Sequence, residues 1–396
     1  MLKHLRTIRE GTMEKQYRFR IYPNEKQKIQ IQKNFGCVRF VYNYYLEKRI
    51  KAYQDSKSNL SLGECGRDLT VLKKIQGFEW LAEADDNSLR YALRDLDFAY
   101  KSFFRGLKQG DRHSNFPRFK SKKETRQSYR SKNNTVRQSI SIYENKIKLP
   151  KLGFVNCRLS KKIEGRILSA TIIQVPSGKY FVTVCCTEVK SSSLAKTHAV
   201  TGIHMGINTL ASLSNGQQIE NIRALKKAKG KLARLQRQLS RKPKGSKNHE
   251  KSRIKLAIAH EKVANQRNDF IHKLTTQLVR EYDLICVRKE PFAEKVKYPW
   301  YSKHAPDAGW GTFVRQLEYK CKWYGKELVK VSGQHPSVQL CSSCGYRNQE
   351  VKVKKTSVRW TCPSCDKRHN RAINAAVNIL AEGIRVRLDR PEVKPG

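Results

Sequence analysis

The pattern of apolar and polar residues divides the chain into two halves with different expected folds. From Tyr17 to Ile21, aromatic and aliphatic residues alternate with arginines, which predicts a half-buried strand. A helix is expected next, and then a second amphipathic helix that Asn87 or Ser88 can cap. Short alternating segments with tight turns within residues 140–186 predict a small β-barrel.

The second half opens after a serine-rich linker at residues 190–196. A strand is expected at residues 200–203, and Asn215-Gly216 marks a hairpin turn beyond its return strand. Residues 221–280 then carry two long amphipathic segments, which predict a helical hairpin.

Charge changes this picture more than any other property. The chain carries 81 Lys and Arg residues against 34 Asp and Glu residues, a formal net charge of +47. A compact protein with this excess repels itself unless a polyanion neutralises it, so a long nucleic acid is the expected partner. The imbalance is sharpest in residues 221–260, where fourteen basic residues stand against Glu250 alone. Apolar runs of about 18 residues are missing, which excludes a membrane-spanning helix.

Two basic segments are candidates for contacts to a nucleic-acid backbone. In the first, Phe116, Phe119 and Tyr129 are interleaved with cations, so rings can stack on bases while cations hold phosphates. The alternative is a charged loop whose rings lie in a core. The basic candidates of this segment are Arg118, Lys120, Lys122, Lys123, Arg126 and Arg130. The second segment is the turn of the helical hairpin, with Lys242, Lys244 and Lys247.

Four of the 11 cysteines form two CxxC pairs, Cys341 with Cys344 and Cys362 with Cys365, separated by seventeen residues. Two such pairs at this separation predict four thiolates around one Zn²⁺, as in a zinc ribbon. With four protein ligands the metal has no open position, so the predicted role is structural. The other cysteines are scattered, which fits a reducing cytoplasm better than a disulfide framework.

The order of these elements, with several short motifs, resembles the TnpB/OrfB proteins of insertion sequences, which are relatives of type V CRISPR nucleases. The motifs are Tyr17-Arg18-Phe19-Arg20-Ile21-Tyr22-Pro23, Ala92-Leu93-Arg94-Asp95-Leu96-Asp97, Pro117-Arg118-Phe119-Lys120-Ser121-Lys122, Asn265-Gln266-Arg267-Asn268-Asp269-Phe270 and Asn374-Ala375-Ala376. The resemblance implies a bilobed α+β multidomain protein. An N-terminal β-barrel with inserted helices is expected to precede an RNase H-like (RuvC) α/β domain that contains the zinc ribbon.

The resemblance also implies domain boundaries and partners. The expected domains are residues 1–189 for the barrel and helical lobe, 197–335 for the first part of the RuvC-like domain, 336–368 for the ribbon and 369–396 for the last helix and tail. The implied partners are a guide RNA and a double-stranded DNA target with a short adjacent motif. Arg90 and Tyr91 are candidates for contacts to that motif.

An active member of this family is expected to carry three carboxylates that hold two Mg²⁺ ions for phosphodiester cleavage. By motif, the corresponding positions in this chain are His204, Arg288 and Ala372. Magnesium requires oxygen ligands that these side chains do not supply, so we expect no catalytic Mg²⁺ and a chain that is not an enzyme. Three alternatives concern single residues: a bulge could bring Glu290 inward, His204 could bind a softer metal, and Arg288 could grip a phosphate.

The function implied by the resemblance is RNA-guided DNA binding without cleavage. A monomer bound to one RNA would form an R-loop at a promoter and repress transcription, in a bacterial cytoplasm and at the nucleoid when target-bound. Two alternatives stay open: an active RNA-guided DNA endonuclease of a transposon, and an RNA-binding or transposition accessory protein without a programmed target. A plasmid-cleavage assay and sequencing of copurifying RNA would separate them.

Overall fold

The computed structural model describes residues 12–110, 114–123, 126–134, 136, 138–206, 209–289, 308–350 and 358–389. Backbone contacts separate two compact units, Met1–Lys190 and Ser191–Gly396. None of the helices in the described ranges is both long and apolar enough to cross a lipid bilayer.

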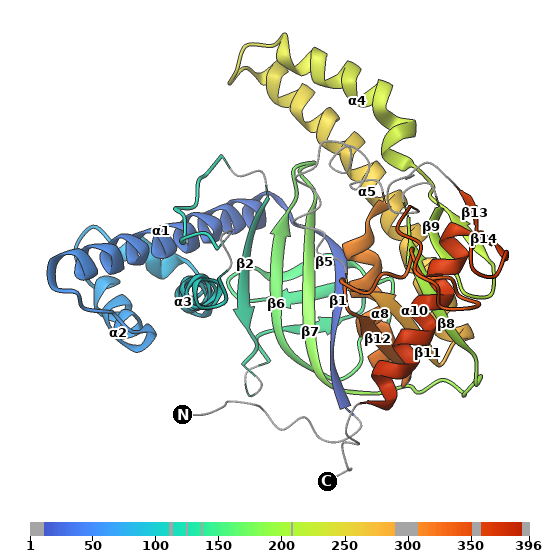
Figure 1. Ribbon diagram of the computed structural model, residues 1–396. Coiled ribbons are helices and arrows are strands. Elements are labelled where there is room, and N and C mark those ends of the chain that lie inside the picture. Colours follow the sequence, from blue (N-terminus) through green and yellow to red (C-terminus); the bar gives the residue numbers. More distant parts are fainter. Residues whose placement is uncertain are drawn as a thin grey trace. The chain divides into compact units, whose positions relative to one another are not determined.

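The first unit is built on a seven-stranded antiparallel sheet (Figure 1). Its strands are β1 (Thr12–Tyr22), β2 (Gln127–Lys132), β3 (Ser141–Tyr143), β4 (Lys146–Leu149), β5 (Gly153–Arg158), β6 (Arg166–Gln174) and β7 (Tyr180–Lys190), in the spatial order β2-β6-β7-β1-β5-β4-β3. Along most of β7, buried and partly exposed residues alternate, as expected for a strand with one face on a core. Most of the strands predicted in this half are therefore confirmed.

The expected closed barrel is wrong, because the described backbone pairing leaves β2 and β3 as the two edges of the sheet. The side chain of Asn133 bonds where a ladder between these edges would have to run. Its Oδ1 accepts a hydrogen bond from the backbone N–H of Ile140 at 2.8 Å, and its Nδ2 donates to the carbonyl of Ile167 at 3.1 Å. A side chain that bonds the backbone in this way competes with strand pairing, and in the described backbone the two edge strands do not pair with each other.

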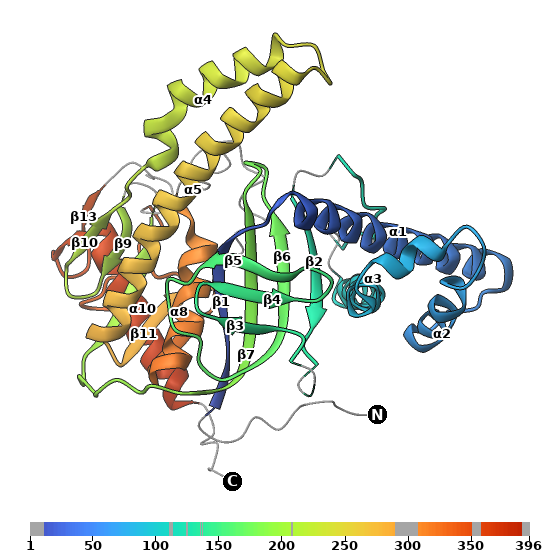
Figure 2. The same ribbon diagram turned by 180° about the vertical axis from the view of Figure 1, so that it is seen from behind.

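Helices lie beside the β2 edge of this sheet (Figures 1 and 2). They are α1 (Glu25–Ser56), α2 (Leu62–Leu72), the 3₁₀ helix η1 (Glu79–Glu83) and α3 (Asp86–Lys108). The N-cap of α3 is Asp85, whose carboxylate accepts from the backbone N–H of Ser88 at 3.1 Å. The predicted caps, Asn87 and Ser88, therefore lie inside the helix, since a carboxylate two or three residues earlier already accepts from the first turn.

The second unit contains a five-stranded sheet. Its strands are β8 (Val200–Met205), β9 (Thr209–Leu213), β10 (Gln218–Glu220), β11 (Leu284–Arg288) and β12 (Glu327–Val331), in the order β10-β9-β8-β11-β12. The first three strands pair antiparallel, whereas β11 runs parallel to both β8 and β12. This topology fits the RNase H-like domain expected from the resemblance.

Helices cover both faces of this sheet. On one face, Ile285 and Val287 of β11 share a core with α5 (Lys247–Glu281) and α8 (Trp310–Tyr324). On the other face, Leu284 and Cys286 pack with α10 (Arg371–Leu388). Burial on both faces explains why β11 is a continuous apolar run rather than an alternating one. A short hairpin of β13 (Arg359–Thr361) and β14 (Arg368–Asn370) leads into α10.

The predicted basic helical hairpin consists of α4 (Ala224–Ser240) and α5. Within the second unit, α4 and the first half of α5 extend well beyond the edge of the sheet (Figures 1 and 2). Only a narrow apolar cluster joins the two helices, with Leu232 of α4 and Leu256 and Val263 of α5 among its buried members. The remaining surface of the hairpin can therefore hold charged side chains.

Candidate functional site

The four predicted ligand cysteines lie together at one end of the second unit. Their sulfur atoms are all within 4.8 Å of one another. Cys341 and Cys365 are separated by 3.7 Å, as are Cys344 and Cys362. Four thiolates at about 2.3 Å from one tetrahedral Zn²⁺ would stand about 3.8 Å apart, so the arrangement fits such a metal.

Backbone donors prepare the sulfur atoms of Cys341 and Cys344 to act as thiolates. Burial raises the pKa of the Cys341 thiol, but the backbone N–H groups of Cys344 and Ser343 outweigh burial and leave this pKa below its ordinary value. The backbone N–H of Tyr346 lowers the pKa of Cys344 to about 7. A thiolate is the form of cysteine that binds metal, so the first knuckle, Cys341 and Cys344, favours the metal-binding state.

Two asparagines of α10, the helix that covers one face of the five-stranded sheet, bind the backbone of this cluster by hydrogen bonds. Asn374 accepts a hydrogen bond from the backbone N–H of Ser342 at 2.9 Å and donates to the carbonyl of Leu340 at 2.7 Å. Asn378, one turn later, donates to the carbonyls of Leu340 and Ser337 at 2.7 and 2.9 Å. The Asn374-Ala375-Ala376 motif therefore has a structural meaning: its amide binds the first knuckle, and its alanines permit close packing.

The positions of the expected catalytic acids lie at the carboxyl ends of two inner strands of the five-stranded sheet and at the start of α10. Ile203 of β8 is in register with Val287 of β11, so His204 and Arg288 follow at the carboxyl ends of adjacent parallel strands. Both share the strand face that α10 covers, because side chains alternate along each strand. Ala372 lies in the first turn of α10, next to the N-cap residue Asn370.

Arg288 forms contacts within its own domain. Its Nε donates to the carbonyl of Gly333 at 3.1 Å, and its Nη2 donates to the same oxygen. A Cβ on Gly333 would lie 2.7 Å from the carbonyl oxygen of Lys289, so only glycine fits there. The guanidinium thus ties the segment after β12 to the end of β11.

These three side chains do not fit a magnesium pair, which needs oxygen ligands. Elsewhere in the described ranges, no group of three or more His, Cys, Asp and Glu side chains besides the cysteine cluster is close enough to share a metal ion. Glu290 lies outside the described residues.

The structure brings several of the predicted nucleic-acid contacts in the first unit into one patch on α3. The ring of Tyr91 has the guanidinium carbons of Arg130 and Arg94 at 5.3 and 5.4 Å from its centroid. Burial raises the pKa of Asp95 on the same helix above its ordinary value, although the nearby cations Lys120 and Arg130 act in the opposite direction. Arg90 is exposed and donates to the carboxylate of Asp86 at 2.8 Å.

The basic segment that follows α3 is held at Lys120 by contacts with α1. The backbone of Lys120 exchanges two hydrogen bonds with the side chain of Asn43, at 2.8 and 2.9 Å. The Lys120 ammonium lies 3.9 Å from the ring centroid of Tyr42. Its exposed basic neighbours are Arg118, Lys122, Lys123 and Arg126.

The aromatic residues of this segment differ in their exposure. Tyr129 is only 3% exposed and packs edge-on against Phe35, so it cannot stack on a base as predicted. Phe116 packs edge-on against two rings of α3 yet stays partly exposed, and Phe119 is 55% exposed. The segment therefore offers two rings to a ligand rather than three.

The second predicted segment forms the tip of the hairpin. Lys242, Lys244 and Lys247 are all exposed there, and Ser246 caps α5 by accepting from the backbone N–H of His249 at 3.0 Å. Sequence reasoning missed two features of this unit. His369 contacts Cys341, although its position fits no metal-ligand spacing, and three lysines border a groove between α4 and α5.

Family models match the chain in three places. A model described as "Probable transposase" (OrfB_IS605) matches residues 183–289, and one described as "Cas12f1-like, TNB domain" matches residues 310–379. A third, described as "Helix-turn-helix domain" (HTH_OrfB_IS605), matches residues 13–58, which are mainly β1 and α1 here.

Curated relatives match nearly end to end. A "Putative RNA-guided DNA endonuclease" of Streptomyces pristinaespiralis is 34% identical over 371 residues, covering 93% of this chain and 89% of the relative. The "Putative RNA-guided DNA endonuclease InsQ" of Escherichia coli K12 is 30% identical over 386 residues, covering 93% and 92%. A Cas12f1 chain, solved in complex with sgRNA and target DNA, aligns with a TM-score of 0.54 at 13% identity, covering 93% and 99%, which shows a shared fold.

These relatives contradict the expectation that the chain is not an enzyme, because proteins that match it over 93% of its length are named endonucleases. That expectation was drawn from three side chains alone. Three positions do not define a complete ligand set, since acidic residues such as Glu290 and Glu294 lie outside the described residues.

Proposed function

Because the chain belongs to the TnpB/OrfB family, we propose that it binds a guide RNA and uses base pairing by that RNA to select a double-stranded DNA target. The one-sided charge of the α4–α5 hairpin carries this proposal. Fourteen basic residues against one acid in residues 221–260 suit a polyanion laid along the helices. In such a complex, pairing selects the sequence while the protein contacts the backbone and a short adjacent motif.

Individual residues take roles within this proposal. Arg118, Lys120, Lys122, Lys123, Arg126 and Arg130 would contact phosphates from the first unit, and Lys242, Lys244 and Lys247 from the hairpin tip. Arg90 and Tyr91 would contact the adjacent motif. The four cysteines would hold a structural Zn²⁺, which is supported by their spacing and by the backbone donors to sulfur.

The bound complex would repress transcription where its target overlaps a promoter. An R-loop held by protein on both strands excludes RNA polymerase from the same DNA. DNA cleavage is a second candidate function, and the names of the two end-to-end relatives favour it.

Purification of the chain with its RNA tests the proposal. Sequencing should show one abundant scaffolded RNA with a variable guide, and the complex should bind a matched duplex at least about tenfold more tightly than a mismatched one. Copurification of heterogeneous cellular RNA, or equal binding to both duplexes, would refute the proposal of RNA-guided binding. Incubating the complex with matched plasmid and Mg²⁺ or Mn²⁺ then decides the second candidate: nicking that stops with EDTA supports cleavage, and intact plasmid that stays bound opposes it.

A further inference from the structure

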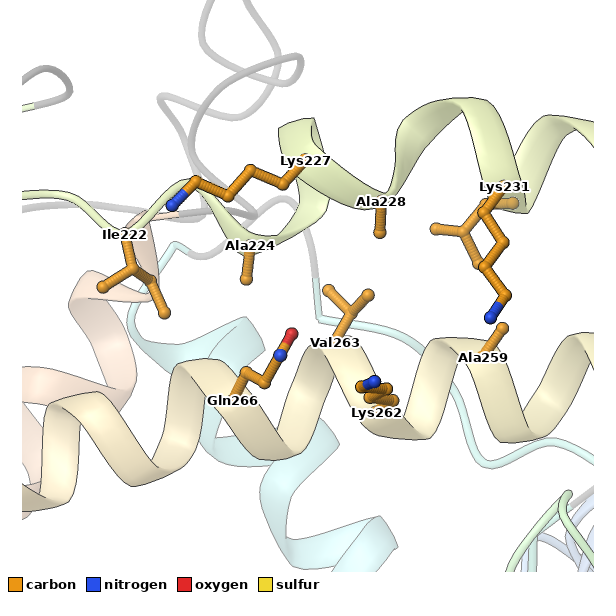
Figure 3. A pocket seen from close by; sticks show the side chains of 10 residues that line it. Ile222, Ala224, Lys227, Ala228, Lys231, Ala259, Lys262, Val263 and Gln266 are labelled. Carbon is orange, nitrogen blue, oxygen red and sulfur yellow. The ribbon is translucent and has the colours of Figure 1, made fainter.

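A groove opens between α4 and α5 near the start of α4 (Figure 3). Its volume is about 380 Å³, in the lower part of the range of about 300–1,000 Å³ typical of small-ligand sites. Ala228 of α4 and Val263 of α5 point into it from opposite sides, and Ala259 borders it (Figure 3). The floor of the groove is thus apolar and made of small side chains.

The groove is open because short side chains meet there, with Ala228 of α4 opposite Val263 of α5, whereas leucines fill other parts of the hairpin. Leu235, Leu239 and Leu256 belong to the apolar cluster that joins the two helices. At Ala228 and Ala259, by contrast, each side chain is a single methyl group, which is too short to close the same gap. The short side chains at these positions therefore keep the floor of the groove open.

The rim of the groove is cationic. Lys227, Lys231 and Lys262 line it and are exposed, and in the described part of the chain no acidic side chain pairs with any of them. Figure 3 shows Lys231 reaching toward Ala259 on the other helix. The helix α4 begins at Ala224, another lining residue, so the positive end of its dipole lies at the groove.

We propose that this groove receives a single unstacked nucleotide of the bound RNA, an inference that rests on the proposed function. The base lies on the alanine and valine floor, and its phosphates lie among the rim lysines. The amide of Gln266, which also lines the groove, can both donate to and accept from the edge of a base.

RNA is the source of this nucleotide because of how the two nucleic acids are engaged. The target strand is paired with the guide and is therefore stacked in a duplex, and the displaced DNA strand is the one competing unpaired source, which the DNA probe below distinguishes from RNA. A folded single-stranded RNA has bulges and loops whose bases are unstacked, and proteins commonly bind such bases in pockets.

The test uses the full chain and an RNA hairpin with one bulged 2-aminopurine nucleotide. The same hairpin without the bulge and a DNA hairpin with the bulge are the comparison probes. Wild-type protein should prefer the bulged RNA over the unbulged RNA by about tenfold, the scale expected for filling an apolar pocket. Ala228→Phe fills the groove and should abolish this preference. Ala233→Phe, on the exposed side of the same helix, should keep it.

A second pair of variants tests the groove without introducing a phenylalanine ring, so its result does not depend on how such a ring packs. Replacing Lys227, Lys231 and Lys262 by Gln should abolish the bulge preference. The charge-matched control replaces the exposed Lys229, Lys251 and Lys255 by Gln, which should lower affinity for both RNA hairpins equally.

Each contrary outcome has a distinct meaning. Equal binding of both RNA hairpins by wild-type protein, or a bulge preference that survives in Ala228→Phe, overturns the groove inference and leaves the proposed function standing. An equal preference for bulged DNA overturns the assignment to RNA. A chain that copurifies with no defined RNA overturns the proposed function itself.

Discussion

The Nε2 atom of His369 lies 3.1 Å from the sulfur of Cys341, and its imidazole is buried against the indole of Trp360, with ring centroids 5.0 Å apart. A ring nitrogen at this distance can donate a hydrogen bond to a thiolate. Such a donor orients a ligand sulfur and offsets part of its charge. His369 is therefore a positioning residue for the metal cluster.

Replacing His369 by Ala should weaken metal retention by about 10–100-fold, the usual effect of losing a hydrogen bond to a metal ligand. The measurement is the rate and extent of Zn²⁺ release to a colorimetric chelator, followed with purified protein. His260→Ala, an exposed histidine on α5, is the matched control and should release metal as the wild type does. Equal release by both variants would show that the contact does not support the metal.

Gly202 should not tolerate even a methyl group. A Cβ at this position would lie 2.1 Å from the carbonyl oxygen of Ala376 and 2.6 Å from the backbone nitrogen of Leu380. Gly202→Ala must push α10 away from β8, so unfolding free energy should fall by about 1–3 kcal/mol or more. Thermal or denaturant unfolding measures this loss.

Gly230 provides the opposite expectation for the same substitution. It lies exposed within α4, and an added Cβ would meet no atom within 4 Å. Gly230→Ala should therefore stabilise the helix by up to about 1 kcal/mol. Similar effects of the two substitutions would contradict the close approach of α10 to β8.

A buried ammonium joins α5 to α8. Lys320 is 5% exposed and donates to the hydroxyls of Thr275 and Thr276 and to the carbonyl of His272, at 2.6, 2.8 and 2.7 Å. Thr275→Val keeps the shape but removes one acceptor, which should cost about 1–3 kcal/mol of unfolding free energy. Thr275→Ser keeps the hydroxyl and should lose less; denaturant titration of the two variants decides between lost bonding and lost packing.

Asp283 makes the second unit sensitive to acid. The ammonium of Lys326 holds the pKa of this carboxylate well below its usual range, and the backbone N–H groups of Thr197 and His198 add to the effect. Because this pKa is lower in the folded state than the unfolded value of about 3.9, the ionised carboxylate stabilises the fold at pH values above about 3.9. This contribution to stability disappears as the pH falls through the folded-state pKa.

The prediction is that Asp283→Asn lowers the melting temperature at neutral pH and that this difference shrinks as the pH falls below about 4. Melting curves of wild type and variant across that pH range provide the measurement. A constant difference at all pH values would mean that the carboxylate's charge plays no part.

The sequence predicted much of the second unit because its signals are local. The CxxC pairs fix their own loop geometry, and the apolar run ending at Val287 identifies a strand buried on both faces. The parallel pairing that brings His204 and Arg288 to the carboxyl ends of adjacent strands was not predicted, since it joins segments about 80 residues apart. His369 was missed because its contact with Cys341 spans 28 residues and depends on the β13–β14 hairpin.

In the first unit, one missed element had a visible signal and another did not. Ser61 and Glu64 form a capping box that starts α2, a pattern present in the sequence. The strand β2 was not predicted within the basic segment because its inward residues, Tyr129 and Ser131, are polar or amphipathic and stand among cations. Their burial and the antiparallel pairing of β2 with β6 distinguish this strand from a basic loop.

The position of α10 in the chain has a consequence during synthesis. All five strands of the second sheet precede α10, and the metal cluster's loops come between β12 and this helix. A nascent chain that has not yet released Arg371–Leu388 from the ribosome exposes the apolar face formed by Leu284, Cys286 and Val329. Metal capture by the growing chain would order the loops between β12 and α10 before the helix arrives, and so would reduce the chance of aggregation before the domain closes.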